Sequence, residues 1–212
     1  MKQSRQESLS IALQLAQDAL KQMDVAKRCA RSGVVYDPRE DMIVIPFLDR
    51  MVRIRCPEGT FVGPEEVPIR DRILVLHYLN RATGAPLSER MVTFKELPGV
   101  EPYLPVFRKR TVERLMARFG DRVADLVEAA QAIGGHQVEY GDVGVTVPAL
   151  PKVRVTFVLW HGDEEFAPSG NVLFDAAISE YLPAEDVIVL TEMVVSRLCK
   201  ALPPPSQPTV RK

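Results

Sequence analysis

The chain has 212 residues, and its 27 basic and 28 acidic side chains give a formal net charge of -1 at pH 7. This balance provides no overall positive field, and no aromatic residues are interleaved with the basic ones, so we expect no binding of nucleic acid or of an anionic membrane. No stretch approaches the roughly 20 apolar residues that are needed to span a bilayer. Residues 1–10 also lack the apolar segment of a signal peptide. The composition therefore predicts a cytoplasmic protein.

The three cysteines, Cys29, Cys56 and Cys199, are odd in number and far apart in the sequence. This pattern predicts reduced thiols rather than a disulfide framework. Iron–sulfur clusters and structural zinc sites need closely spaced thiolates or histidines, and the chain contains no CxxC pair. The residues therefore identify no cofactor, and we expect Cys56 to be a small core residue.

The N-terminal region shows first a helical and then a strand pattern. Apolar residues recur at steps of four and three from Leu9 to Leu20. This spacing predicts an amphipathic helix over residues 6–31, with Gly33 as its end. Three short strand-like runs follow within residues 34–61, separated by turn residues, and they predict a β-meander.

A second helix is predicted to begin at Pro68 and to end at Gly84. His77 lies at the border of its buried stripe, on the same side as Arg81. We expect a hydrogen-bonded histidine at such a boundary, and a ligand-binding histidine is the alternative.

A basic segment follows the Pro- and Gly-rich loop 97–105. It begins with Arg108 and Arg110, and the four-residue spacing places Arg110, Arg114 and Arg118 on one helix face. Guanidinium groups grip carboxylates and phosphates with two hydrogen bonds, so this stripe is a candidate site for a small anionic ligand. The alternatives are a solvated face or ion pairs with the acids at 163–165.

The C-terminal half contains a predicted hairpin over 138–147 and a short helix over 172–181. Pro183 is predicted to start the last long helix. Glu185 and Asp186 fall in its first turn, where acids stabilise the positive end of the helix dipole. This position gives both acids a structural interpretation.

The centre of the chain is a strand-like run over 153–160 that leads directly into three consecutive acids. Alternate residues of the run are apolar, which indicates a strand with one face on the core. Gly162 allows a sharp turn after it, and flanking apolar residues such as Phe166 suggest that the loop is held against the core. Loops on rigid strands commonly present site residues, so the candidates at this position are Trp160, His161, Asp163, Glu164, Glu165 and, further along, Asp175.

Together these patterns predict one α+β domain over residues 1–202, with an antiparallel or mixed sheet of about six strands covered by four to six helices. Residues 203–212 are rich in proline and are predicted to form a disordered tail.

Five segments form a recognisable set: ILVLHYL at 73–79, FKELPG at 94–99, WHGDEEF at 160–166, LFD at 173–175 and YLPAED at 181–186. As a set they resemble an uncharacterised bacterial and archaeal family catalogued as a domain of unknown function, over about 44–198. The resemblance marks His77, Trp160, Asp163, Glu164, Glu165 and Asp175 as motif positions. It implies a link to metal or cofactor metabolism in anaerobes, because some relatives carry an additional iron–sulfur segment that this chain lacks.

Three hypotheses follow for the function. The first is a non-catalytic binding or accessory domain that holds a small anionic ligand or a redox partner protein between the basic helix and the acid loop. The second is a metal-dependent enzyme in which Asp163, Glu165 and His161 bind a divalent cation. In the third, the acids form structural salt bridges to Arg108, Arg110 or Arg114.

Overall fold

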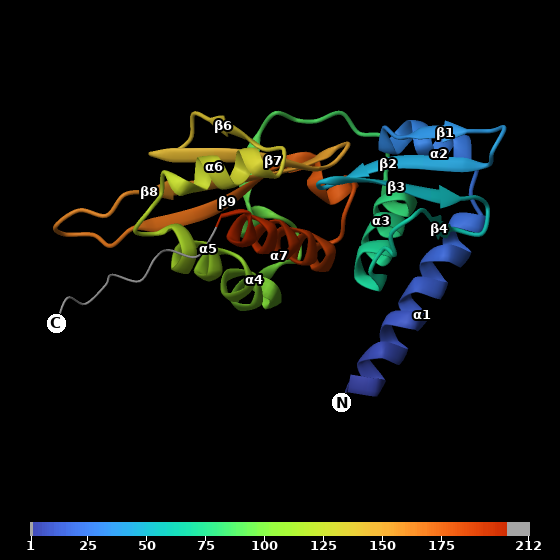
Figure 1. Cartoon of the computed structure of the whole chain (residues 1–212), viewed down its shortest axis with the longest axis horizontal. Helices are drawn as coiled ribbons and strands as arrows, with labels where there is room; N and C mark the ends of the chain where they lie inside the picture. Colours follow the sequence, from blue (N-terminus) through green and yellow to red (C-terminus); the bar gives the residue numbers. More distant parts are fainter. Residues whose placement is uncertain (1, 203–212) are drawn as a thin grey trace.

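The computed structural model describes residues 2–202, with side chains from residue 6 onward, and it contains two antiparallel sheets (Figure 1). The first has the order β1-β2-β3-β4, and the second has the order β5-β9-β8-β7-β6. The α+β class and the antiparallel pairing are confirmed. The prediction of one sheet of about six strands is wrong, because helix α3 separates the meander from strands that pair only with one another. The predicted tail, 203–212, lies outside the described residues.

The strands of the first sheet are β1 (Val35–Asp37), β2 (Met42–Phe47), β3 (Arg50–Arg55) and β4 (Thr60–Val62). Those of the second are β5 (Met91–Thr93), β6 (His136–Val138), β7 (Val143–Leu150), β8 (Val153–Trp160) and β9 (Ser169–Asp175). The α-helices are α1 (Lys2–Lys21), α2 (Val25–Ser32), α3 (Ile69–Arg81), α4 (Leu104–Arg110), α5 (Val112–Phe119), α6 (Asp125–Ala132) and α7 (Ala184–Ala201). None of these helices combines the length and apolarity that a membrane crossing requires.

The predicted N-terminal helix over 6–31 is two helices, α1 and α2. The break occurs at Asp24, whose Oδ1 accepts a hydrogen bond of 3.0 Å from the backbone N–H of Lys27. Such an N-cap satisfies an amide that would lack a partner at a helix start, so it favours a new helix over continuation of the old one. α2 then ends as predicted at Gly33, which has a φ of 69°.

The predicted helix over 172–181 is also wrong. Residues Ser169–Asp175 form strand β9, and only Ala176–Glu180 are helical, as the 3-10 turn η3. β9 pairs with β8 from Val155↔Phe174 to Trp160↔Ser169. This long-range pairing overrides the local pattern. β8 is therefore an inner strand, and Thr156 and Val158 are buried rather than solvated.

The two sheets lie end to end, and α3 lies beside their junction, between α1 and α7 (Figure 1). Leu48 of the first sheet donates its N–H to the carbonyl of Ala149 in the second, at 2.9 Å. Tyr78 of α3 is fully buried there, and its hydroxyl donates to the Ser32 carbonyl and accepts from the N–H of Lys152. One hydrophobic core runs through both sheets, so the chain forms a single domain.

Replacing Tyr78 with Phe is expected to destabilise the fold. The Ser32 carbonyl and the Lys152 N–H would lose their partner in a buried position, which costs about 1–3 kcal/mol. Urea unfolding measures this change. The control is Tyr36→Phe, whose hydroxyl bonds the exposed Asp41 and whose loss should change the free energy of unfolding by less than about 0.5 kcal/mol. Equal losses in both variants would show that the Tyr78 hydroxyl does not secure the junction.

Candidate functional site

The acid loop, residues 161–168, connects β8 to β9 and closes on itself. Oδ1 of Asp163 accepts hydrogen bonds from the N–H groups of Phe166, at 2.7 Å, and of Glu165, at 2.8 Å. The N–H of Asp163 in turn donates to the Phe166 carbonyl at 2.9 Å. These amide bonds, first that from Phe166 and then that from Glu165, lower the pKa of the Asp163 carboxyl. The first of the three acids therefore serves to build the turn.

The loop projects beyond the end of the sheet instead of packing on the core (Figure 1). Phe166 is 70% exposed and Trp160 is 39% exposed, so the expectation that apolar neighbours hold the loop down is wrong. The acid loop is linked instead to the turn between β6 and β7, because the N–H of His161 donates to Oδ2 of Asp142 at 2.7 Å. Strands β8 and β9 extend past the helices beside them (Figure 1), so Phe166 near the tip has little apolar surface to contact.

The side chains of this loop do not form the arrangement of ligands that a metal site needs. The metal-dependent hypothesis requires Asp163 and Glu165 to converge on one ion, but the chain turns between them. Across residues 2–202, no group of three or more His, Cys, Asp or Glu side chains is placed to hold a metal ion. Asp163, Glu165 and His161 therefore lack the converging geometry that the metal-dependent hypothesis requires.

The basic residues pair with a helix rather than with the acid loop. Arg110 and Arg114 lie 3.6 and 3.7 Å from the carboxylate of Glu192 on α7, and Arg108 lies 3.5 Å from Glu113. The predicted salt bridges to the acids at 163–165 are therefore wrong. Tertiary packing places α7 beside α4 and α5, and this position makes Glu192 the nearest acid.

Asp175 is the most extensively hydrogen-bonded of the candidate acids. Its carboxylate accepts from the N–H and the hydroxyl of Ser88, from the N–H of Glu89 and from the N–H of Ala177, at 2.8–3.0 Å. Burial raises the pKa of Asp175, but these hydrogen bonds outweigh it, and the pKa lies below its usual value. Asp175 therefore fixes the loop before β5 against the end of β9, which is a structural role.

His77 and Asp186 form a pair that the sequence did not connect. Nδ1 of His77 lies 2.7 Å from Oδ2 of Asp186, across 109 residues of chain. The expectation of a hydrogen-bonded boundary histidine is confirmed. Asp186, interpreted only as a helix-start acid, has a specific partner as well. The sequence did contain a signal that could have suggested this pair, because both residues belong to the set of recognisable segments.

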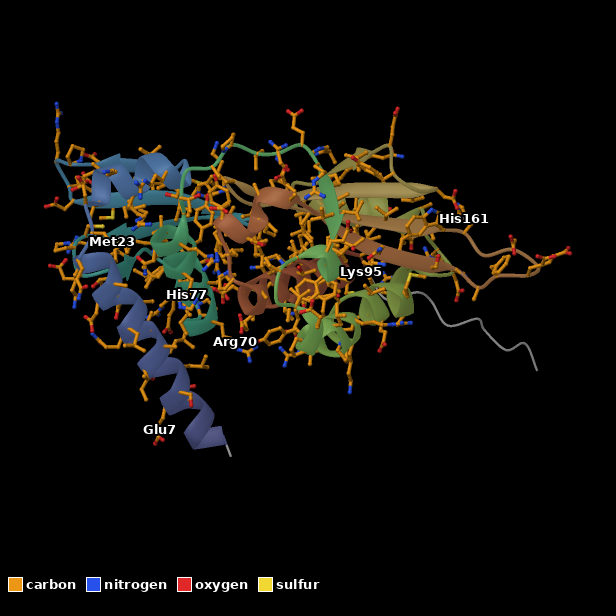
Figure 2. All side chains as sticks on the ribbon, turned by 180° about the vertical axis from the view of Figure 1, so that it is seen from behind. Glu7, Met23, Arg70, His77, Lys95 and His161 are labelled. Carbon is orange, nitrogen blue, oxygen red and sulfur yellow. The ribbon has the colours of Figure 1, made fainter. Side chains whose placement is uncertain are left out.

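A groove of about 630 Å3 lies between the start of β9 and helices α4 and α5. We call it the β9-edge groove. Its apolar lining includes Phe94, Leu104, Phe107, Val112 and Met116. Lys95 and Arg108 contribute positive charge to it, and Glu113 contributes one acid. Figure 2 shows Lys95 in the middle of the molecule, between His77 and the distant His161. Of the sequence candidates, the groove includes Arg108 alone.

The backbone at this edge of β9 is open toward the groove. β5 pairs with β9 only over Leu173–Asp175, whereas β8 pairs with it over Ser169–Phe174. The N–H of Ala176 donates to the carbonyl of Arg90, which directly precedes β5. In an antiparallel sheet, alternate residues of a strand direct their N–H and carbonyl groups to the same edge. Counting back from Ala176, every second residue of β9 therefore faces the edge on which β5 lies. Gly170 belongs to this set, and its N–H and carbonyl therefore face the groove.

Val172, the next residue of that set along β9, already uses its N–H, which donates to Oδ1 of Asn171 at 2.9 Å. Packing also explains the glycine. A Cβ at Gly170 would lie 2.6 Å from Leu159 and 2.7 Å from Met116. The absence of a Cβ lets α5 pack closely against β9 at this position. The N–H of Gly170 remains available at the groove.

The acid loop should tolerate loss of charge at its two outer acids. Glu164→Gln and Glu165→Gln are each expected to change the free energy of unfolding by less than about 0.5 kcal/mol, because both are exposed. Asp163→Ala should cost more, since two amides of the turn lose their acceptor. Denaturant unfolding compares the three variants. A large loss of stability in the glutamine variants would show that these acids have pairing partners after all.

The His77–Asp186 pair should make stability depend on pH. The hydrogen bond to Asp186 raises the pKa of His77 above 6.5 despite partial burial. The stabilisation is therefore complete below the pKa of the unfolded state and is lost as the pH rises through the folded pKa. Wild type should exceed His77→Gln in unfolding free energy by about 1 kcal/mol near pH 5, and by less near pH 9. A difference that does not depend on pH would refute an ionised pair.

Comparison with known proteins adds one finding. No curated protein and no solved structure gives a significant match to the chain. A family model described as a domain of unknown function (DUF3786) matches residues 24–197. The match begins earlier than the predicted likeness at about residue 44, and it includes α2, both sheets and most of α7. Since it spans more than half of the 212 residues, the chain belongs to the DUF3786 family.

Proposed function

We propose that this chain is a non-catalytic binding domain that holds a small, partly apolar anion in the β9-edge groove. The observation that supports this proposal is the open main chain of Gly170 beside two cations and an apolar wall. The groove volume of about 630 Å3 falls within the range of about 300–1,000 Å3 that is typical of small-molecule sites.

The charges favour an anion over a cation. Lys95 and Arg108 are both exposed at the groove, and a main-chain N–H adds a third donor. Glu113 reduces the net charge, but it lies 3.5 Å from Nε of Arg108 and so orients the guanidinium. The terminal nitrogens of Arg108 then remain available for a carboxylate or phosphate, which such nitrogens bind well.

The apolar lining favours a ligand with a flat or aliphatic body. Phe107 stacks on Phe94 with ring centroids 4.1 Å apart and contacts Phe174 edge-on at 6.2 Å. This aromatic cluster gives the groove a rigid floor, and rigid, preformed sites bind small molecules at a lower entropic cost. Anionic cofactors belong to this ligand class, so an accessory role in cofactor metabolism is part of the proposal. A cytoplasmic location is also part of it, consistent with the free thiols of the buried Cys29 and Cys56.

The test uses anilinonaphthalene sulfonate, an apolar anionic dye whose fluorescence reports binding. Lys95→Gln and Arg108→Gln should each weaken dye binding up to about fivefold, and the double variant about tenfold, because each removes one exposed charge. Added salt should weaken wild-type binding through screening. Dye displacement then ranks candidate carboxylates and phosphates.

The matched control is Lys109→Gln, which removes an exposed charge next to Arg108 on α4 but outside the groove. It should bind the dye as wild type does. Phenylnaphthylamine, a neutral dye of similar shape, should bind all variants equally. The proposal fails if the double variant retains wild-type affinity for the anionic dye, or if Lys109→Gln weakens binding as much as Arg108→Gln.

A further inference from the structure

A second groove, of about 410 Å3, lies between α1 and α3 beside the start of α7. We call it the His77 groove. Its walls are Leu15, Ala16 and Ala19 from α1 and Pro183 before α7, and its polar side chains include His77 and Arg81. Figure 1 shows α1 leaving the rest of the molecule at this point, and Figure 2 labels His77 on α3 beside it. The β9-edge groove shares no lining residue with it.

The wall formed by α1 is held in place. The side-chain amide nitrogen of Asn80 on α3 donates to the carbonyl of Ala16 at 2.8 Å, and that of Gln17 donates to Gly59 at 3.0 Å. Leu15 is nevertheless 65% exposed and contributes an apolar surface that the fold does not bury. The His77 groove is therefore a shallow apolar recess that is largely open to solvent.

Two nitrogen-bearing side chains lie one helical turn apart in this recess. His77 and Arg81 are four residues apart on α3, so their side chains are neighbours on the helix surface. Asp186 fixes the His77 ring through Nδ1, which leaves Nε2 without a hydrogen-bond partner among the described residues. Arg81 is oriented in the same way, because its Nε donates to the carbonyl of Ser179 at 2.9 Å. No acid within residues 2–202 forms a salt bridge with Arg81 in the structure.

We infer that the His77 groove binds a carboxylate that carries a short aliphatic chain. The carboxylate would accept hydrogen bonds from Nε2 of His77 and from the terminal nitrogens of Arg81. The chain would lie along Leu15, Ala19 and Pro183. A carboxylate fits better than an alcohol because both polar groups donate when His77 is protonated, and the aliphatic wall offers no partner for a polar tail.

The inference is tested on the full chain with octanoate at a fixed, mildly acidic pH. Carbon–hydrogen correlation spectra separate the three histidines of the sequence, so each spectrum contains its own controls. The ring signals of His77 should move on titration, while those of the exposed His136 and His161 should stay in place. Acetate, which lacks the chain, and octanol, which lacks the charge, should each bind about tenfold more weakly or worse.

Two substitutions on α1 give a matched pair. Leu15→Glu places a repelling charge in the groove and should weaken octanoate binding about tenfold or more. Ile11→Glu is its control, because Ile11 is similarly exposed, at 61%, one turn earlier and outside the groove. Both sites are exposed, so folding should not change.

Three results would overturn the inference. The ring signals of all three histidines could move together, which would indicate non-specific binding. Octanol could bind as tightly as octanoate, which would remove the role of His77 and Arg81. Ile11→Glu and Leu15→Glu could alter the sedimentation of the protein equally without affecting octanoate, which would identify this face of α1 as a helix-docking surface instead.

Discussion

The buried hydroxyl of Tyr78 is the constraint on which the arrangement of this fold most depends. It lies on α3 beside the junction of the sheets, and it bonds one main-chain group where α2 ends and one where β7 turns into β8. Its ring stacks on Tyr181, with centroids 5.9 Å apart, just before α7. Because this contact positions α3 and α7, His77, one residue before Tyr78, and Asp186, five residues after Tyr181, come within hydrogen-bonding distance.

Several motif residues that suggested chemistry have structural roles in the fold. Asp163 accepts the amides of its own turn, and Asp175 accepts four hydrogen bonds that position a loop. Phe94 and Phe174 meet around Phe107. A set of recognisable segments can therefore reflect the contacts that hold two sheets together as much as a ligand site. The acid loop illustrates the difference, because its outer acids are exposed and its first acid is occupied by the main chain.

The positions of the acidic side chains divide the basic residues into those that form structural ion pairs and those that can bind a ligand. Glu192 of α7 lies near both Arg110 and Arg114, so these two residues stabilise the contact between α7 and the helices beside it. Arg108 and Lys95 point to the β9-edge groove, where the nearest acid, Glu113, offsets only one of them. A stripe that looked uniform in the sequence therefore divides into two functions. The division falls within α4, between Arg108 and Arg110, before the C-cap residue Thr111.

The sequence by itself determined the α+β class, the antiparallel meander, the helix that carries His77 and the relation to a family of unknown function. These features follow from periodicities of two and 3.6 residues and from turn residues, which are local properties of the chain. Only the tertiary structure decided that the strands form two sheets, that residues 169–175 are a strand, that Asp186 meets His77 and that Gly170 faces a groove. Each of these depends on contacts between distant segments, and the free energy of such contacts exceeds local preference without leaving a periodic signal in the sequence.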